Sequence, residues 1–445
     1  MKALEAEQYD VAIIGGGFSG LSAAWEIAKA GLSVAVVEAD QTVGGLAGSF
    51  RIGDTYVEKF YHHWFTSDRA VANLACELGQ EDSIVYRATR TGMYYANKSF
   101  RLSTPLDLIR FGGLPLAERL RLGRLVLRAR AVADWRDLES LSAAEWLTSL
   151  GGEAVYRTIW EPMLAGKFGP YANDISAVWM WGKLKLRGGS RSKGGGEVLA
   201  YYKGGFAALA TRLVEAVQAA GGVVHTDTAV TSLVGDASGV AALATSSGAI
   251  RAKNVIATVP LPTFADLVEP LTSPSYVAGL RKIQFLANVC LVLELDRSLS
   301  DTYWLNVADP SFPFVGVIEH TNFEPTSTYG GTHLAYLSKY LPEDSDLYRR
   351  SDDDLLAFAI PHIQRLFPDF KRDWVKRHHV WRARFSQPIV TKHYSSLLPD
   401  IKTPLPNLYL CTMAQIYPED RGTNYAIEKG REAAKRVLES VKSEK

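Results

Sequence analysis

Tyr9-Asp-Val-Ala-Ile-Ile-Gly-Gly-Gly-Phe-Ser-Gly20 is the most informative segment of the sequence, together with the residues that follow it. Its first half, up to Ile14, is a β-branched run that predicts a buried parallel strand. Leu21 to Ala30 is alanine-rich, has helical spacing and ends at Gly31, and Leu32 to Glu38 predicts a second strand. A strand, a glycine turn, a helix and a strand within about thirty residues predict the first half of a dinucleotide-binding fold.

The glycines of this turn have the spacing G-x-G-x-x-G, and each position has a physical role. Gly15 permits the tight turn, Gly17 lets the backbone approach a pyrophosphate, and Gly20 lets the helix pack closely on the strand. The start of the helix offers free N–H groups and a positive dipole end to phosphates. Glu38 ends the second strand, where a carboxylate accepts hydrogen bonds from ribose hydroxyls. The residues predicted to hold the dinucleotide here are Gly15, Gly17, Phe18, Ser19, Gly20, Glu38 and Ala39.

The residues after Glu38 favour one dinucleotide over the others. Gly44-Gly45 follows Glu38 after five residues, and this spacing resembles the extended motif of the glutathione-reductase-like flavoproteins. Within that group the chain is similar to the superfamily of FAD-dependent amine oxidases, protoporphyrinogen oxidases and phytoene desaturases. The resemblance implies that the cofactor is FAD and that Gly45 and Leu46 contact it. Many members of the superfamily have arginine, which meets the diphosphate, at the position of Leu46.

Two internal segments resemble the same superfamily. Tyr202-Lys-Gly-Gly-Phe206 precedes a helix, like the corresponding glycine pair of the family. Ile256-Ala-Thr-Val-Pro260 resembles the strand that crosses near the flavin. The resemblance also implies that the backbone of Val230 contacts adenine.

The C-terminal segment resembles the part of the superfamily that closes over the flavin. Arg421-Gly-Thr-Asn-Tyr-Ala426 leads into a helix, and in the family such a helix directs its N-terminus at the flavin edge where negative charge develops on reduction. Thr412-Met413 stands where relatives carry Gly-Asp. The resemblance implies that the closing residues are Gly422, Thr423 and Asn424.

The remaining segments complete the predicted architecture. Residues 105–150 have helical spacing, and residues 282–339 alternate like antiparallel strands, with Ala287 to Leu295 the clearest. A loop rich in glycine, serine and basic residues is expected at 188–196. With the resemblance, these patterns predict an α/β fold: a discontinuous, glutathione-reductase-like Rossmann domain that binds FAD, with an inserted substrate domain that is first helical and then antiparallel β. The FAD-binding parts are predicted at residues 1–75, 201–265 and 401–445, and the substrate-domain parts at residues 76–200 and 266–400.

Two segments carry candidates for the chemistry. Phe60-Tyr-His-His-Trp-Phe-Thr-Ser-Asp68 is a row of aromatic and imidazole rings. Because the superfamily's chain passes beside the flavin ring here, His62 and His63 are candidate catalytic residues; the alternative is that they only pack a core. Just before the closing helix, three charged residues form either a local ion pair or an acid/base group beside the flavin, with the arginine as the third catalytic candidate: Glu419, Asp420 and Arg421.

Local resemblance to UDP-galactopyranose mutase is found in four segments. His62 with Thr66 to Asp68 matches the A-H-x-x-H-T-N-D stretch of that family, and Val317-Ile-Glu-His320 matches its I-I-E-H. Met93-Tyr-Tyr-Ala-Asn-Lys-Ser-Phe100 resembles its short strand pair, and Lys167-Phe-Gly169 resembles the end of its K-x-W-G helix.

This second resemblance implies that Arg187 and Tyr94 contact the substrate. In the mutases two arginines grip the substrate diphosphate, and Arg187 falls near one of them. Gly316 stands at the position of the other, which argues against the mutase reaction because a diphosphate favours bidentate arginines. Arg191 and Lys193 in the glycine-rich loop either replace that charge or are simply solvated.

The composition narrows the classes of partner. The net charge is +1 over 445 residues, so nothing global points to nucleic acid. The three cysteines are far apart and contain no C-x-x-C, so they indicate neither a metal site nor a disulfide framework, which fits a cytoplasmic protein. Leu108 to Trp135 mixes leucines and arginines at helical spacing. It is either a solvated basic face or a surface that lies on the inner face of an anionic membrane and admits a lipid-linked substrate.

Three functional hypotheses follow from these features. The first is an FAD-dependent oxidoreductase that dehydrogenates a bulky substrate by hydride transfer to flavin N5; an isoprenoid, a lipid-linked or nucleotide-linked sugar, or a polycyclic compound are the expected substrate classes. The second is a mutase-like isomerase that uses reduced FAD without net redox change. The third is a flavin-binding protein with little catalysis. Substrate-dependent bleaching of the flavin distinguishes the first from the other two.

Overall fold

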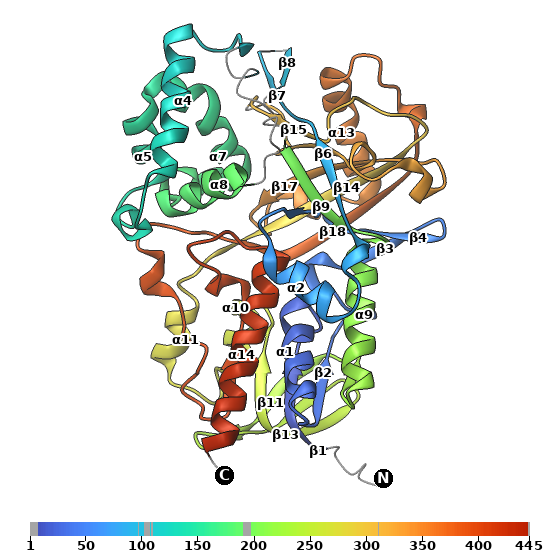
Figure 1. Ribbon diagram of the computed structural model, residues 1–445, viewed down its shortest axis with the longest axis vertical. Coiled ribbons are helices and arrows are strands. Elements are labelled where there is room, and N and C mark those ends of the chain that lie inside the picture. The colour runs from blue at the N-terminus through green and yellow to red at the C-terminus, as the bar shows by residue number, and fades with distance from the viewer. Residues whose placement is uncertain are drawn as a thin grey trace.

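A computed structural model describes residues 8–96, 98–101, 107, 110–189, 197–309 and 311–443. The molecule is elongated, with an α/β layer in its lower part and, above it, a group of helices beside a second sheet (Figure 1). Both termini lie at the lower end (Figure 1). The predicted fold class is confirmed, since segments from the beginning, middle and end of the chain build the lower layer.

The lower layer is built on a mostly parallel sheet. Its strands run in the order β10 (Val223–His225), β2 (Val34–Val37), β1 (Gln8–Ile14), β13 (Gly248–Ala257), β12 (Gly239–Thr245) and β11 (Val230–Asp236), while β19 (Leu408–Leu410) pairs with the end of β13. β12 pairs antiparallel with both of its neighbours, β13 and β11, and the other pairs are parallel. β2 is buried throughout, and so is the second half of β1, which explains why the sequence there is a continuous apolar run.

Three helices stand side by side next to this sheet: α1 (Phe18–Lys29), α9 (Gly205–Ala219) and α14 (Thr423–Ser443) (Figure 1). α1 and α14 approach each other very closely, because a Cβ atom at Gly430 would lie 2.1 Å from the carbonyl oxygen of Ser19. α1 in turn lies close to the turn before it, since a Cβ atom at Gly20 would lie 2.0 Å from the carbonyl oxygen of Gly15. Helix α14 is thereby held against the glycine turn.

The upper part contains a second seven-stranded sheet. Its strands run in the order β18 (Val375–Pro388), β14 (Phe285–Leu295), β17 (His333–Leu341), β16 (Gly316–Glu319), β15 (Trp304–Val307), β7 (Thr91–Tyr95) and β8 (Lys98–Arg101). All neighbours are antiparallel except β15 and β7, which are parallel, so the predicted antiparallel sheet needs this one correction.

Strand β14 is buried on both faces rather than alternating between core and solvent. Val289 and Leu291 pack into a core that includes helix α13 (Asp352–Leu366). Cys290 and Val292 pack into the core of the lower layer. The predicted strand is therefore confirmed, but the reason for its apolar sequence is that it joins two cores.

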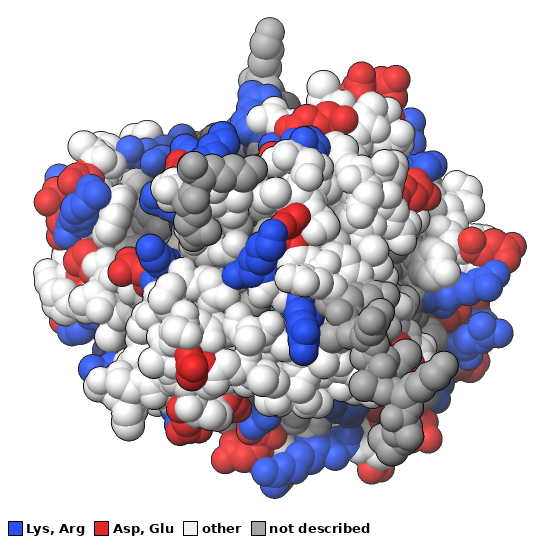
Figure 2. Space-filling view, turned by 90° about the horizontal axis from the view of Figure 1, so that it is seen from below, with Lys and Arg blue, Asp and Glu red and all other residues white. Residues whose placement is uncertain are grey.

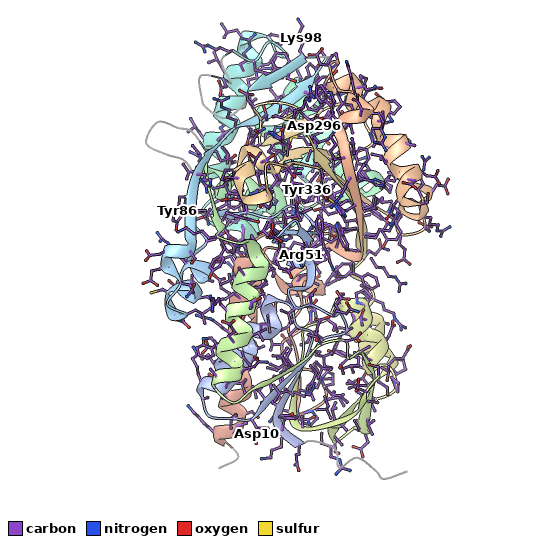
Figure 3. The ribbon with its side chains drawn as sticks, turned by 90° about the vertical axis from the view of Figure 1, so that its right-hand side faces the viewer. Asp10, Arg51, Tyr86, Lys98, Asp296 and Tyr336 are labelled. Atoms are coloured by element: carbon purple, nitrogen blue, oxygen red, sulfur yellow. The ribbon has the colours of Figure 1, made fainter. Side chains whose placement is uncertain are left out.

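A buried polar cluster joins the two layers. Tyr336 of β17 lies at mid-height (Figure 3) and its hydroxyl donates a 2.8 Å hydrogen bond to the backbone carbonyl of Glu58, the last residue of β4 (Thr55–Glu58). The buried Glu58 carboxylate accepts hydrogen bonds of 2.7 Å from the backbone N–H of Phe206 and from the hydroxyl of Tyr201. Burial raises the pKa of Glu58 to about 7. This cluster fixes the chain immediately before the aromatic segment that begins at Phe60.

The helical region beside the second sheet contains α4 (Leu116–Arg130), α5 (Ala143–Gly151), α6 (Glu153–Val155), α7 (Glu161–Phe168) and α8 (Ala177–Gly189). Residues 188 and 189 of the loop predicted at 188–196 belong to α8, which continues to Gly189; residues 190–196, with Arg191 and Lys193, lie outside the described residues. Within the described ranges, no helix combines the length and the hydrophobicity needed to cross a bilayer. On the face seen from below, basic and acidic side chains are interspersed (Figure 2).

We expect Gly430→Ala to destabilise the protein by about 1–3 kcal/mol, because the added methyl group would overlap the carbonyl of Ser19 and force α1 and α14 apart. The free energy of unfolding, measured in urea, checks this. Gly123→Ala is the matched control, since Gly123 also lies inside a helix but a Cβ atom there meets nothing within 4 Å. The control is expected to be neutral or stabilised by up to about 1 kcal/mol. Equal effects of the two substitutions would contradict the close helix contact.

Candidate active site

The glycine turn has the geometry expected of a dinucleotide site. Gly15 has a φ of +106°, which only glycine adopts without strain, and its N–H donates a 2.8 Å hydrogen bond to the carbonyl of Val37. The Glu38 carboxylate accepts hydrogen bonds from the backbone N–H groups of Gly16 (2.6 Å) and Asp40 (2.8 Å), which orients it at the end of β2. The ring of Phe18 packs on that of Phe206, so Phe18 can serve a phosphate only through its backbone.

Gly17 is not required by the protein's own packing. Its φ is −72°, and a Cβ atom there would lie 3.8 Å from Gly45, the nearest residue, which is ordinary contact. Gly45 faces it and has a φ of +58°. The two loops therefore present backbone without side chains, a cradle that a Cβ atom at Gly17 would begin to fill. Such a surface fits a diphosphate that must approach the backbone.

The adenosine side of this turn is formed by the end of β2 and the start of β11. The N–H of Thr228 donates a 2.8 Å hydrogen bond to the backbone carbonyl of Glu38, which joins the segment leading to the half-buried Val230 to the end of β2. Ala39 is exposed just after β2, and Ser19 is half-buried in the first turn of α1. These positions are compatible with their predicted contacts to the dinucleotide.

The start of α14 closes one side of a cavity. Gly422, Thr423 and Asn424 line the cavity together with Leu46. The side-chain oxygen of Asn424 accepts hydrogen bonds from Ala70 and Val71, at the start of helix α2 (Arg69–Glu77). This side chain is therefore occupied in joining two helices, which leaves its backbone for the predicted cofactor contact.

The cavity has a volume of about 310 Å³ and lies between the two layers and the helical region. Aromatic side chains form much of its wall, contributed by the segment 60–65, by the helical turn before α7, by α8, by the second sheet and by α14. They are Phe60, Tyr61, Trp64, Phe65, Trp160, Trp179, Trp304, Tyr340 and Tyr425.

Both predicted histidines line this cavity. His62 Nδ1 lies 2.6 Å from the carbonyl oxygen of Phe60, so Nδ1 is the donor and Nε2 is left as an acceptor. Burial, with a smaller contribution from Arg421, lowers the pKa of His62 to about 4. His62 is therefore neutral at pH 7. His63 Nδ1 lies 2.9 Å from the hydroxyl of the buried Tyr303.

Asp420 and Arg421 do not form the ion pair with each other that was one of the two sequence interpretations. Instead the buried Asp420 carboxylate contacts the ammonium group of Lys183 and accepts a 2.9 Å hydrogen bond from the indole N–H of Trp179. Lys167 Nζ lies 3.8 Å from the same carboxylate. Burial alone would raise the pKa of Asp420, but the cations of Lys183, Lys167 and Arg421 outweigh it and lower this pKa far below its usual range. Asp420 is thus ionised and is not a proton donor.

Arg421 is directed towards the second sheet. Its Nε donates a 3.1 Å hydrogen bond to the side-chain oxygen of Gln387, and its Nη2 donates a 2.9 Å hydrogen bond to the hydroxyl of Tyr340. A guanidinium group stays protonated at physiological pH, so Arg421 supplies charge and hydrogen bonds rather than acid/base catalysis.

The two predicted substrate contacts have different outcomes. Tyr94 does not line the cavity: its ring lies in the core between the second sheet and α13, and its hydroxyl approaches the carbonyl of Arg365 at 3.4 Å. Because successive side chains of a strand alternate between the two faces, Tyr94 lies on the face of the second sheet that packs against α13, away from the site. Arg187 lies in the last turn of α8, and its side chain is outside the described residues.

Sequence reasoning missed Lys183, Trp179 and Tyr340. A signal for the first two was present, because residues four apart on a helix share a face, and Lys183 Nζ lies 5.6 Å from the ring centroid of Trp179. Tyr340 had no local signal, since β17 reaches the cavity only through the pairing of the second sheet.

The sequence model of one protein family, the flavin containing amine oxidoreductases, matches residues 18–438 of this chain. The chain belongs to this family. Among curated relatives, the provisionally named flavin-containing monoamine oxidase AofH of Mycobacterium tuberculosis is 26% identical over 187 residues, which cover 40% of this chain and 41% of that protein. Zeta-carotene desaturase of Synechocystis is 27% identical over 176 residues, covering 34% of this chain and 36% of that protein. These alignments thus span about two fifths or less of the relatives' length.

Solved structures share the fold over nearly the whole chain. A provisionally named protoporphyrinogen oxidase from Exiguobacterium has a TM-score of 0.77 at 15% identity, covering 98% of this chain and 100% of its own. Putrescine oxidase with putrescine bound gives 0.71 at 20% identity, covering 97% and 99%. Reduced UDP-galactopyranose mutase gives 0.73 at 15% identity, covering 97% and 95%. The predicted membership of the flavin amine oxidase superfamily, the FAD cofactor and the class of FAD-dependent oxidoreductases are confirmed.

We expect Gly17→Val to abolish FAD binding while leaving the fold intact. The protein itself has room for the added side chain, but that side chain would occupy the space that the diphosphate needs. The flavin absorbance of the purified variant, with circular dichroism to verify folding, measures this. Gly53→Val is the control, at an exposed turn where a Cβ atom meets nothing within 4 Å. Because Gly53 has a φ of +57°, this substitution strains the backbone and so tests the fold, but it lies outside the predicted cofactor site. A yellow Gly17→Val protein with full cofactor content would refute the site.

Proposed function

We propose that the protein dehydrogenates a bulky substrate in the cavity beside α14, oxidising a C–H or C–N bond. The observation that carries this proposal is the aromatic cavity that meets the residues at the start of α14, with the neutral imidazole of His62 in its wall. Bound FAD supplies two-electron redox chemistry as a hydride acceptor at N5.

The chain's own side chains have three tasks in this proposal. The aromatic wall binds and orients an apolar substrate and excludes water. His62 Nε2, which has no hydrogen-bond partner among the residues that the structure describes, can take a substrate proton because Nδ1 is bound to the carbonyl of Phe60. Glu38 and the bare backbone at Gly17 and Gly45 would hold the dinucleotide. Substrate classes with a large apolar part, such as isoprenoids, lipid-linked sugars or polycyclic compounds, suit these walls.

A mutase-like isomerisation is the second candidate, and one observation disfavours it. At Gly316 a Cβ atom would lie 2.4 Å from the carbonyl oxygen of Leu305, because β16 and β15 are closely paired. An arginine cannot occupy this position without disturbing the sheet, so the second diphosphate-binding arginine of the mutases is not present at this position.

Anaerobic mixing with candidate substrates tests the proposal. A dehydrogenase bleaches the oxidised flavin without added reductant, because the substrate delivers two electrons. Turnover only after pre-reduction, with no consumption of oxidant, would support the mutase instead, and absence of both across the substrate classes would favour a protein that only binds flavin.

In the same assay, we expect His62→Ala to retain FAD and to slow flavin reduction by about 10² or more, the range typical of general acid–base groups. In the wild type the rate should fall only as pH drops through about 4, where His62 becomes protonated, rather than near the ordinary value for histidine. His63→Ala is the comparison variant and should have the smaller effect, because its Nδ1 pairs with a hydroxyl that can donate or accept, so its tautomer is not fixed as that of His62 is by a carbonyl. Unchanged kinetics of His62→Ala would return His62 to a packing role.

We further propose that helix α4 rests on an anionic membrane surface and so admits a substrate with a lipid part. Leu116, Leu120 and Leu127 are between 61% and 67% exposed and share one stripe of the helix, because they are four and seven residues apart. The opposite face packs through Leu122 and Leu125. α4 lies at the outer edge of the helical region (Figure 1). It contains one glutamate against five arginines: Arg119, Arg121, Arg124, Arg128 and Arg130.

Co-sedimentation with phosphatidylglycerol vesicles tests this surface. The holoenzyme should bind these vesicles, and binding should weaken with salt and be absent with phosphatidylcholine. The double variant Leu120→Gln, Leu127→Gln should lose binding, whereas Val234→Gln, which changes an exposed apolar residue of β11, should retain it. Equal vesicle binding by the two variants would contradict the proposal. So would the finding that the exposed leucines of α4 bind a soluble protein and not the vesicles.

A further inference from the structure

Positive charge gathers at one wall of the cavity. Lys167 comes from α7, Lys183 from α8 and Arg421 from the segment before α14, and all three surround Asp420. Three cations from three separate elements therefore meet one carboxylate. One negative charge cannot neutralise three positive ones.

The wider cavity does not restore the balance. Among the described residues that line it, the cations are Lys167, Lys183 and Arg421, and the carboxylates are Asp68 and Asp420. Burial raises the pKa of Asp68 to about 6, so its charge is also the more easily lost of the two. His62, which also lines the cavity, is neutral because burial lowers its pKa. The cavity is net positive.

The cations are held in place before any ligand arrives. Lys167 Nζ lies 4.7 Å from the ring centroid of Trp179 and 5.3 Å from that of Tyr340. The Arg421 guanidinium is fixed by Gln387 and Tyr340 through Nε and Nη2, and its Nη1 makes no hydrogen bond within the described part of the chain. A preorganised guanidinium with a remaining donor, next to two ammonium groups, is suited to an oxyanion.

We propose that Lys167, Lys183 and Arg421 form a subsite for an anionic group of the substrate, a phosphate or a carboxylate. The inference rests on the proposed function, since it assigns the substrate to the same cavity. An excess of positive charge in a partly dehydrated site attracts an anion and repels an alkylammonium group, because charges interact more strongly where water is excluded. The substrate is then a molecule with a large apolar part and an acidic group, and not a simple amine.

Ligand titration of the oxidised holoenzyme tests this subsite without turnover. Inorganic pyrophosphate represents the phosphate class, benzoate the carboxylate class and benzylamine the cationic class, and binding is followed through the flavin spectrum and by calorimetry. We expect pyrophosphate or benzoate to bind, and the tighter of the two identifies the acidic group. We expect benzylamine to bind at least about tenfold more weakly than benzoate, which has a similar shape.

Variants of α8 locate the effect. Lys183→Met should weaken binding of the anion by about tenfold or more with unchanged FAD content, and Lys183→Arg should restore most of the affinity because it keeps the charge. Lys185→Met is the matched control: Lys185 is exposed on the same helix, stacks on Trp181 and does not line the cavity. It should bind anions like the wild type.

Two results would overturn the subsite: anion binding that is unaffected by Lys183→Met, or benzylamine binding more tightly than benzoate. Because these measurements need no turnover, they are independent of the flavin-bleaching test. Anion binding without bleaching would leave the subsite and refute the dehydrogenase proposal, whereas bleaching by a neutral or cationic substrate, with no anion bound, would do the reverse.

Discussion

The close contact between α1 and α14 is the constraint on which the site depends. Because Gly430 has no side chain, the last helix can lie against the carbonyl of Ser19, in the first turn of the helix that follows the glycine loop. The start of α14, with Gly422 to Asn424, is thereby brought to the cavity next to Leu46. Asn424 continues this linkage by accepting hydrogen bonds from the first turn of α2. Residues about four hundred positions apart thus share one wall.

Asp420 has a comparable role between the FAD-binding layer and the helical region. It precedes α14, and its carboxylate is held by Lys183 and Trp179 of α8. A buried carboxylate is costly unless it is paired, so this contact fixes the position of α8 relative to the closing helix. It also gathers cations beyond the number needed to neutralise one acid. The same contact that assembles the cavity therefore sets its electrostatic character.

The positive charge of the cavity does not favour the cationic amines after which the family is named. The structures that share the fold include an amine oxidase and a sugar-nucleotide mutase, and an α/β flavin scaffold is compatible with both. The cations that we propose to select the substrate come from α7, α8 and the segment before α14, outside the glycine motifs that carry the resemblance to the family.

The sequence by itself determined the Rossmann turn, the class of dinucleotide and the two ends of the cofactor site. These features depend on local backbone geometry, such as the positive φ at Gly15, and on fixed spacings between glycines and Glu38. Only the tertiary structure decided that Tyr94 belongs to a core, that Asp420 pairs with Lys183 rather than Arg421, and that Lys167, Lys183 and Arg421 share one wall. The physical reason is that these contacts join elements distant in sequence. Burial and charge pairing depend on which elements meet, and no local pattern records that.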